Sequence, residues 1–240
     1  MMCKKYKEEH LVSYSHSYDK YIEKTAINVK KLKERFDSVK ILHKIIDVEN
    51  IWMEIYRKKW KEDRKKYGDY IVVCGCGSCK LAMHTRTICY NLEDHIKYSV
   101  DGANKESGVT LPAQMEEGIL IFKNLYSKYN IDYYNPVCNE VRTDKICYEL
   151  SLSNKKEKKF PQEYIFHETD SSCWNGSLHN IYVRYYFIPK FGIKKHKENA
   201  KKYINDKLLI AEEWINRYFQ NKDKDIKLLI KKLGNGGKKL

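Results

Sequence analysis

The sequence predicts an α+β fold, with N- and C-terminal amphipathic helices around a small central strand and Cys-rich helix unit, and a late antiparallel β-meander. Apolar residues recur every three to four positions near both ends of the chain, which is the helical pattern. A short apolar run directly precedes the cysteines, and we expect it to be a buried strand. Apolar and polar residues alternate in three later runs, as in strands with one buried face.

The first part of the chain predicts two helices and one strand. An apolar stripe at helical spacing predicts a helix over residues 17–36. Alternation over residues 39–45 predicts a short strand. Asp47 is a suitable N-cap for a second helix, which we expect to end near Gly68, because glycine readily adopts the backbone conformation that terminates a helix.

The middle of the chain contains the cysteines. We expect residues 71–73 to form the short buried strand and residues 80–97 to form a third helix. Residues 100–111 have the composition of a loop. A further short helix is expected over residues 113–129, ended by Asn130.

The late part of the chain predicts a sheet followed by helices. The alternating runs cover residues 146–152, 164–168 and 181–187, and an antiparallel meander is the simplest arrangement for them. Helical spacing returns over residues 203–218, and a short last helix is expected over residues 226–233.

The length of 240 residues is enough to bury a sizeable core. We expect a mainly helical region with the Cys-rich unit over residues 1–130 and a sheet with C-terminal helices over residues 131–240, or a single domain over residues 10–233. No apolar run reaches the roughly 18 residues that a membrane span needs, and the start MMCKKYKEEH shows no signal peptide. We therefore expect a cytoplasmic or nuclear protein without membrane contact, in which thiols are first considered as metal ligands or redox groups.

The net charge of +14 is concentrated at the two ends of the chain. Residues 1–70 carry 18 basic and 12 acidic groups, residues 71–190 carry 14 of each, and residues 191–240 carry 14 basic and 6 acidic groups. This excess predicts binding to nucleic acid or to another polyanion. The expected contacts are Lys194, Lys195, Lys197, Lys201 and Lys202, with Lys58, Lys59, Lys65 and Lys66 as a second patch.

The lysine excess has two other interpretations. The chain has 39 lysines and 7 arginines, although arginine is the residue that contacts phosphate and guanine through two parallel hydrogen bonds. Many lysines together with many Tyr, Ile and Asn are typical of AT-rich coding sequences, so the lysines are also consistent with a merely solvated surface. In another hypothesis the protein is a non-catalytic, virion-type assembly protein whose aromatic helix faces bind a protein partner or a second copy of the chain.

The cysteines predict a structural zinc site. Cys76 and Cys79 form a C-x-x-C knuckle, and Cys74 precedes them on the same side of the expected strand. Zinc takes four nitrogen or sulfur ligands in a tetrahedron, and His84 is the best fourth ligand. The alternative is that these thiols are packed as small apolar side chains.

A redox function is the third hypothesis for the same thiols. The expected order of strand, helix, strand, C-x-x-C and helix over residues 39–97 resembles the opening of the thioredoxin family, and Cys76-Gly77-Ser78-Cys79-Lys80 is similar to its active-site turn. The resemblance implies a thiol oxidoreductase in which Cys76 is the nucleophile and Cys79 is the resolving thiol. A thiolate at a helix N-terminus is stabilised by the helix dipole.

Other catalytic patterns are weaker. Cys173 with His167 or His179 suggests a thiol nucleophile with a base, although no oxyanion-hole motif accompanies it. The chain contains neither G-x-x-x-x-G-K-[ST] nor G-x-G-x-x-G, so these two nucleotide-binding classes are unsupported. We therefore assign no enzyme class from the sequence.

Overall fold

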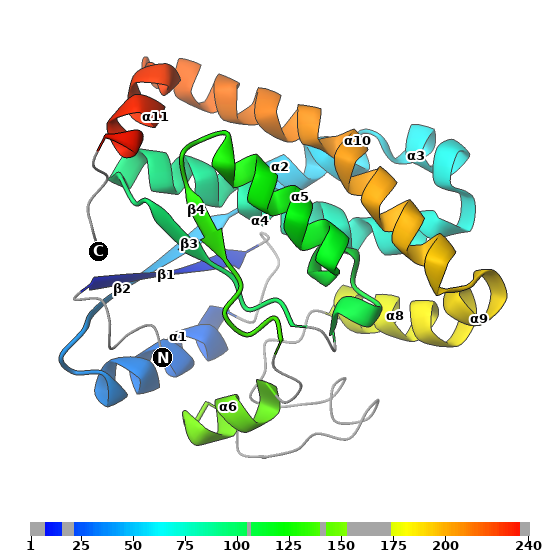
Figure 1. Cartoon of the computed structure of the whole chain (residues 1–240), viewed down its shortest axis with the longest axis horizontal. Helices are drawn as coiled ribbons and strands as arrows, with labels where there is room; N and C mark the ends of the chain where they lie inside the picture. The colour runs from blue at the N-terminus through cyan, green and yellow to red at the C-terminus, as the bar shows by residue number, and fades with distance from the viewer. Residues whose placement is uncertain (1–7, 16–21, 105–106, 140–142, 153–173, 236–240) are drawn as a thin grey trace.

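The computed structural model describes residues 8–15, 22–104, 107–139, 143–152 and 174–235. This part of the chain is mainly helical and contains two short pairs of parallel strands (Figure 1). Its elements are β1 (Glu8–Ser15), α1 (Ile22–Arg35), β2 (Lys40–Asp47), α2 (Glu49–Trp52), the π-helical η2 (Met53–Arg57), α3 (Trp60–Tyr67), η3 (Gly68–Tyr70), α4 (Ile71–Asp94), β3 (Tyr98–Val100), η4 (Ser107–Val109), η5 (Pro112–Gln114), α5 (Glu116–Ser127), β4 (Asp132–Tyr134), α6 (Thr143–Glu149), α8 (Trp174–Tyr182), the π-helical η6 (Val183–Phe187), α9 (Ile188–Phe191), α10 (Ile193–Gln220) and α11 (Ile226–Gly234).

The long helix α4 runs through the middle of the molecule (Figure 1). It packs against α2, α3, α8, α10 and α11, and α5 packs in turn against α10. One series of buried side chains on α4 recurs every three to four positions: Ile71, Cys74, Ser78, Leu81, Thr85, Ile88 and Leu92. Other sides of α4 are buried as well, at Val73, Ala82, His84, Cys89 and Tyr90. Burial on several sides of α4 holds the other helices around it.

Four clusters of buried side chains form the core of the described residues, and two of them contain most of it. The larger cluster contains residues from Val48 to Leu233, so it draws on both halves of the chain, and Phe122 and Phe219 are among its largest members. The smaller cluster joins α3, the start of α4, η6 and α10 around Tyr70. Burying an apolar side chain of this size contributes about 1.5–3 kcal/mol.

Both strand pairs are parallel. β1 pairs with β2, with Glu8 opposite Lys40, and β3 pairs with β4, with Tyr98 opposite Asp132. Parallel neighbours need a crossover connection; α1 lies between β1 and β2 in the chain, and α5 lies between β3 and β4. The predicted strand over residues 39–45 is confirmed as β2, but its partner β1 was not expected.

Several predicted helix boundaries are confirmed. Gly68 is the C-cap of α3, with φ of +53° and ψ of −131°, a backbone conformation that glycine adopts readily. Asn130 lies three residues after α5, with φ of +58°. The N-cap predicted at Asp47 is displaced by one residue, because Val48 is the N-cap of α2; the Asp47 carboxylate accepts the N–H of Glu49 at 2.8 Å. The single helix expected from there to Gly68 is divided into α2, η2 and α3. The helix expected over residues 226–233 is α11.

The predicted strand over residues 71–73 is wrong, because these residues form the first turn of α4. Ile71 and Val73 are buried and Val72 between them is exposed, an alternation that a strand would share. The burial that follows at Cys74, Ser78 and Leu81 has helical spacing. Gly75 and Gly77 lie within α4, although each glycine costs about 1 kcal/mol relative to alanine inside a helix. Burial along the 24-residue helix outweighs that cost. The helix expected over residues 80–97 is only the later part of α4.

The predicted antiparallel meander is also wrong, and the α+β class with it. Residues 146–152 lie in α6 and the turn after it, and residues 181–187 lie at the end of α8 and in η6. The run over residues 164–168 lies outside the described residues. Only the two parallel pairs are sheet within the described part of the chain.

The run over residues 181–187 shows why alternating apolar and polar residues led to a wrong prediction of strands. A strand would bury every second residue, but the structure buries Val183 and Phe187, four positions apart, and exposes Tyr185 between them. The same apolar positions satisfy both periods over so short a run. Packing of Val183 and Phe187 in the smaller core cluster selects the helix.

Candidate functional site

The four predicted zinc ligands lie on α4 and do not converge. Successive residues of an α-helix are rotated by about 100° and advance by about 1.5 Å, so Cys74 and Cys76 point to opposite sides and His84 lies about 15 Å beyond Cys74. Zinc ligand atoms must all lie about 2.0–2.3 Å from one ion. Within the described residues no three His, Cys, Asp or Glu side chains gather so as to hold a metal ion. Zinc binding by these residues and Cys79 remains a prediction, and it requires α4 to unwind.

The C-x-x-C does not lie at a helix N-terminus. Cys76 is the sixth residue of α4, and the residues before it are helical, so the order of elements behind the thioredoxin resemblance is interrupted. Cys74 is buried and donates to the carbonyl oxygen of Tyr70 at 3.5 Å. Burial raises the pKa of the Cys74 thiol, and the carboxylate of Asp63 raises it further. A raised pKa disfavours the thiolate, which is the reactive form.

The third predicted pair is only partly described. Cys173 and His167 lie outside the described residues, and His179 lies on α8. Burial lowers the pKa of His179 to about 4. A base with so low a pKa takes up a proton poorly at neutral pH, so His179 is a weak general base in this conformation.

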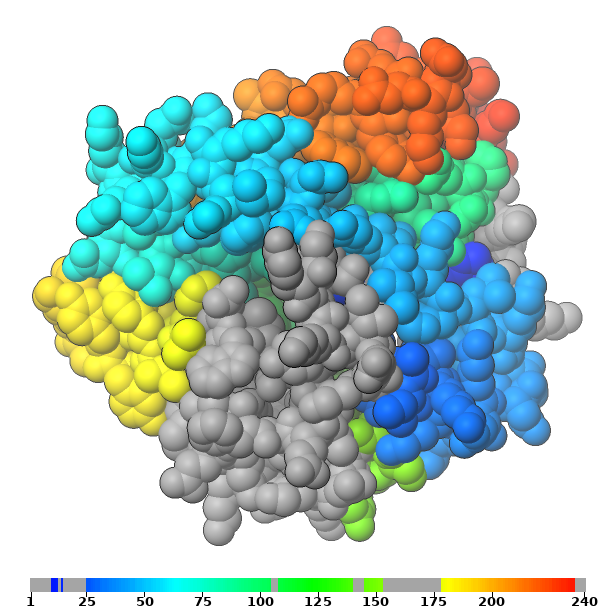
Figure 2. All heavy atoms as spheres, turned by 180° about the vertical axis from the view of Figure 1, so that it is seen from behind, coloured from blue at the N-terminus to red at the C-terminus, as the bar shows by residue number. Residues whose placement is uncertain are grey.

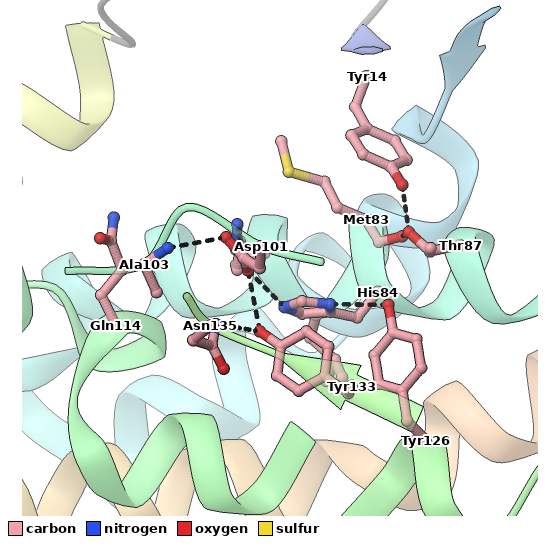
Figure 3. A network of polar contacts seen from close by, with 12 residues as sticks. Tyr14, Met83, His84, Thr87, Asp101, Ala103, Gln114, Tyr126, Tyr133 and Asn135 are labelled. Carbon is pink, nitrogen blue, oxygen red and sulfur yellow. Dashed lines mark hydrogen bonds and ion pairs between the residues drawn. The ribbon is translucent and has the colours of Figure 1, made fainter. Parts of the chain in front are cut away.

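A chain of polar side chains, which we call the Asp101 network, connects α4 to the ends of β3 and β4 (Figure 3). Asp101 follows β3, and its carboxylate accepts Lys80 Nζ at 2.8 Å, the Tyr133 hydroxyl at 3.0 Å and the N–H of Ala103 at 3.1 Å. His84 Nε2 lies 3.5 Å from the same carboxylate. His84, predicted as a zinc ligand, therefore belongs to a protein network.

The Asp101 network continues from His84 toward β1. His84 Nδ1 lies 3.0 Å from the Tyr126 hydroxyl, and the tautomer with Nε2–H toward Asp101 leaves Nδ1 to accept the Tyr126 proton. Three residues further along α4, the Thr87 hydroxyl forms a hydrogen bond with Tyr14 on β1 (Figure 3). The polar contacts thus join β1, α4, α5, β4 and the residue that follows β3.

The electrostatics of the Asp101 network indicate a structural role. Burial, together with the nearby Lys80 ammonium, lowers the pKa of His84 to about 3. Burial by itself would raise the pKa of Asp101, but Lys80 and the hydrogen bonds outweigh it and hold the pKa below its usual value. At neutral pH a charged Lys80–Asp101 pair therefore contacts an uncharged His84. Asp101 and Gly102 fall within the loop that was predicted over residues 100–111, so the sequence analysis assigned no role to Asp101.

The two predicted lysine patches lie side by side. Lys66 of α3 and Tyr67 both bond to the carboxylate of Asp206 on α10. Lys66 Nζ is 5.6 Å and Lys202 Nζ is 5.9 Å from the centre of the Tyr67 ring, so one lysine of each patch flanks the same ring. We call this region the α3–α10 lysine surface; it comprises Lys58, Lys59, Lys65, Lys66, Lys194, Lys195, Lys197, Lys201 and Lys202.

Only part of this charge is neutralised within the protein. Lys59 pairs with Glu62 at 3.4 Å, Lys197 pairs with Glu117 at 3.2 Å, and Lys66 pairs with Asp206. The remaining members form no ion pair with the described residues: Lys58, Lys65, Lys194, Lys195, Lys201 and Lys202. The surface therefore presents a net positive charge to solvent.

The chain matches no family model, and comparisons with the curated proteins and with the solved structures also find no match. Its function is therefore argued from its own residues. Among the described helices, none combines the length and the apolar character that crossing a bilayer demands. Of the two features described above, the Asp101 network is largely buried, whereas the α3–α10 lysine surface is exposed to solvent.

Proposed function

We propose that the protein binds nucleic acid through the α3–α10 lysine surface. The observation that carries this proposal is that one lysine from each of two sets that are far apart in the sequence, Lys66 and Lys202, lies at the Tyr67 ring. Lysines that lie close together repel one another, so a polyanionic partner stabilises them. Each phosphate that they contact also releases condensed counterions, which strengthens binding. The tight contact of α3 with Asp206 keeps the two sets adjacent before any partner arrives.

The start of α10 supports the same partner. Helices are stabilised by acidic side chains in the first turn and destabilised there by basic ones, by about 0.3–1 kcal/mol each. The first turn of α10 has no acidic residue and contains Lys194 and Lys195. The dipole and these lysines both favour an external anion, and a bound phosphate offsets their unfavourable placement.

The lysines of α10 also share one side of the helix. Five of them fall within an arc of about 160°, as helix geometry requires for their spacing. The buried residues His196, Ala200 and Tyr203 lie on the opposite side and face the core. A strand of nucleic acid lying along α10 can therefore contact several of the lysines at once.

The test compares two variants of equal net charge. Lys194, Lys195, Lys201 and Lys202 are changed to Gln in one variant, and Lys123, Lys227, Lys231 and Lys232, on α5 and α11, are changed to Gln in the control. Fluorescence anisotropy of a labelled oligonucleotide gives the affinity as a function of salt. We expect the first variant to lose at least about tenfold in affinity and to reduce the salt slope by about 0.7–0.9 for each phosphate contact removed.

Two results would overturn the proposal. One is the absence of binding by the wild-type protein at about 50 mM salt, where electrostatic binding is strong. The other is an equal loss in both variants, which would mean that net charge and not this surface determines binding. Equal affinity for poly-glutamate and for the oligonucleotide would instead identify an acidic protein as the partner class.

A further inference from the structure

A cluster of exposed aromatic rings borders the α3–α10 lysine surface. Tyr185 and Tyr186 in η6 are 59% and 39% exposed, and Phe191 at the end of α9 is 42% exposed. The ring centres of Tyr186 and Phe191 are 6.5 Å apart. Large aromatic side chains grouped at the surface mark a place where a partner binds.

A lysine lies between two of these rings. Lys190 Nζ is 2.8 Å from the Tyr186 hydroxyl, 4.9 Å from the centre of the Tyr186 ring and 5.0 Å from the centre of the Phe191 ring. Aromatic faces and a cation therefore alternate over a short distance. This is the composition of a site that stacks bases and contacts their phosphates.

The cluster is held in place from beneath. η6 is a π-helical turn, and its residues Val183 and Phe187 are buried in the smaller core cluster. Phe187 also packs against Phe191, with ring centres 4.8 Å apart. The rings are thus presented by an anchored turn, and π-helical turns of this kind are frequent at functional sites.

The cluster is continuous with the lysine surface. Only Gly192 and Ile193 separate Phe191 from Lys194 on α10. At the other side, the Tyr182 hydroxyl donates to the carbonyl oxygen of Asp69, just after α3. Figure 2 shows these segments, the cyan residues that contain α3 and the yellow residues of α8 and α9, next to each other on one face.

We propose that the nucleic acid bound at this surface is single-stranded, with bases stacked on Tyr185, Tyr186 and Phe191 and phosphates on Lys190 and the start of α10. This inference rests on the proposed function and names its substrate class. A duplex keeps its base faces inside its own stack, so it offers the rings nothing to stack on, whereas a single strand exposes them. Stacking of this kind is sequence-tolerant, because every base has an aromatic face.

The test separates stacking from charge with three ligands of equal length: a single strand, its blunt duplex and an abasic single strand. The variant Tyr185→Ala/Phe191→Leu removes two exposed rings and no charge. Tyr148→Ala, which removes an exposed ring on α6, is the matched control, and Tyr185→Phe keeps the ring. Thermal melting verifies that each variant is folded.

We expect the wild-type protein to bind the intact single strand more tightly than the duplex or the abasic strand. Tyr185→Ala/Phe191→Leu weakens binding of the intact strand by at least about fivefold and leaves the other two ligands unchanged. Tyr148→Ala and Tyr185→Phe change little. Equal wild-type affinity for all three ligands, or a loss that is the same for all three, overturns the inference. If the four-lysine variant still loses affinity in that case, the proposed function survives; if no ligand binds at all, the proposed function fails as well.

Discussion

The ammonium of Lys207 on α10 lies 2.7 Å from Oδ1 and 2.6 Å from Oδ2 of Asp63 on α3, and both side chains are almost fully buried. The same ammonium is 5.3 Å from the centre of the Tyr203 ring. This ion pair connects the two helices that carry the lysine surface. Charges removed from water in this way are stable only as a pair, because each alone would lose its hydration without compensation.

Removing one member of the Asp63–Lys207 pair should therefore strongly destabilise the protein. We expect Lys207→Met to lower the free energy of unfolding by about 3–5 kcal/mol, because it leaves the Asp63 carboxylate buried and unpaired. Urea denaturation followed by circular dichroism measures this directly.

Two comparisons show whether burial is the cause. The double variant Asp63→Leu/Lys207→Met should recover most of the loss, since apolar side chains replace both charges. Lys59→Met removes a largely exposed pair with Glu62 and should cost less than about 1 kcal/mol. A Lys207→Met variant no less stable than Lys59→Met would contradict the assignment of a buried pair.

Helices with long apolar stripes could be predicted from the sequence, and short segments could not. The stripe behind α10 continues over many turns, so no other period fits it. Residues 71–73 and 181–187 are too short to separate the two periods, and their β-branched and aromatic residues favour strands locally. Their packing partners, on α3, α8 and α10, are distant in sequence and invisible to local patterns. β1 was missed because its partner β2 lies on the far side of α1.

The sequence predicted which lysines form the candidate site, but it did not predict how they are arranged in space. Both lysine patches were identified from charge, but their meeting at Tyr67 depends on Asp206 and on the Asp63–Lys207 pair. The aromatic cluster at Tyr185 was assigned to a sheet, so its position beside α10 could not be expected. The cysteine grouping drew attention to α4 because spacing alone does not show whether a C-x-x-C lies in a turn or within a helix.

Gly118 on α5 offers a test of close packing. A Cβ there would overlap the carbonyl oxygen of Pro112 and lie 3.2 Å from the Cα of Ala113. We expect Gly118→Ala to destabilise the protein by about 1–3 kcal/mol, as overpacking does. In the matched variant Gly77→Ala, also within a helix, the new Cβ meets nothing closer than 3.8 Å, and we expect a gain of about 0.5–1 kcal/mol. Melting temperatures of the two variants that shift in the same direction would contradict this account.

Acid should destabilise the protein through its buried histidines. Burial lowers the pKa of His84 to about 3 and that of His196 to about 4. Between these values and the unfolded value near 6.5, the unfolded chain binds more protons, so stability is complete above about pH 6.5 and falls as the pH decreases. Each such histidine contributes a slope of about 1.4 kcal/mol per pH unit within that window.

His196→Phe isolates one of these contributions. The His196 ring lies among the rings of Tyr70 and Phe187, with centres 5.5 Å and 6.0 Å away, so phenylalanine fits its surroundings. Between pH 6 and pH 5 we expect the variant to lose less stability than the wild-type protein, by about 1.4 kcal/mol per pH unit in denaturant titrations. Identical pH slopes for the two proteins would show that His196 titrates normally in the folded state.

The thiols of α4 should differ sharply in reactivity. Burial raises the pKa of Cys89 to about 12 and raises that of Cys74 as well, whereas Cys76 and Cys79 are half-buried on the remaining sides of the helix. We expect iodoacetamide at about pH 8 to modify Cys76 and Cys79 at least about 100-fold faster than Cys74 and Cys89, because the thiolate is the nucleophile. Mass spectrometry of timed samples gives the four rates, and urea-unfolded protein is the control in which they become similar.

The same measurement tests the two remaining hypotheses for these thiols. A thiol oxidoreductase would need the reactivity of Cys76 to titrate with a pKa of about 3.5–7.5, below the value of about 8.5 for a free cysteine. A zinc site would make added Zn²⁺ protect Cys74, Cys76 and Cys79 together, which a continuous α4 cannot do because these side chains point to different sides of the helix. Rates that are unaffected by Zn²⁺ and rise with pH are the result that the intact helix requires.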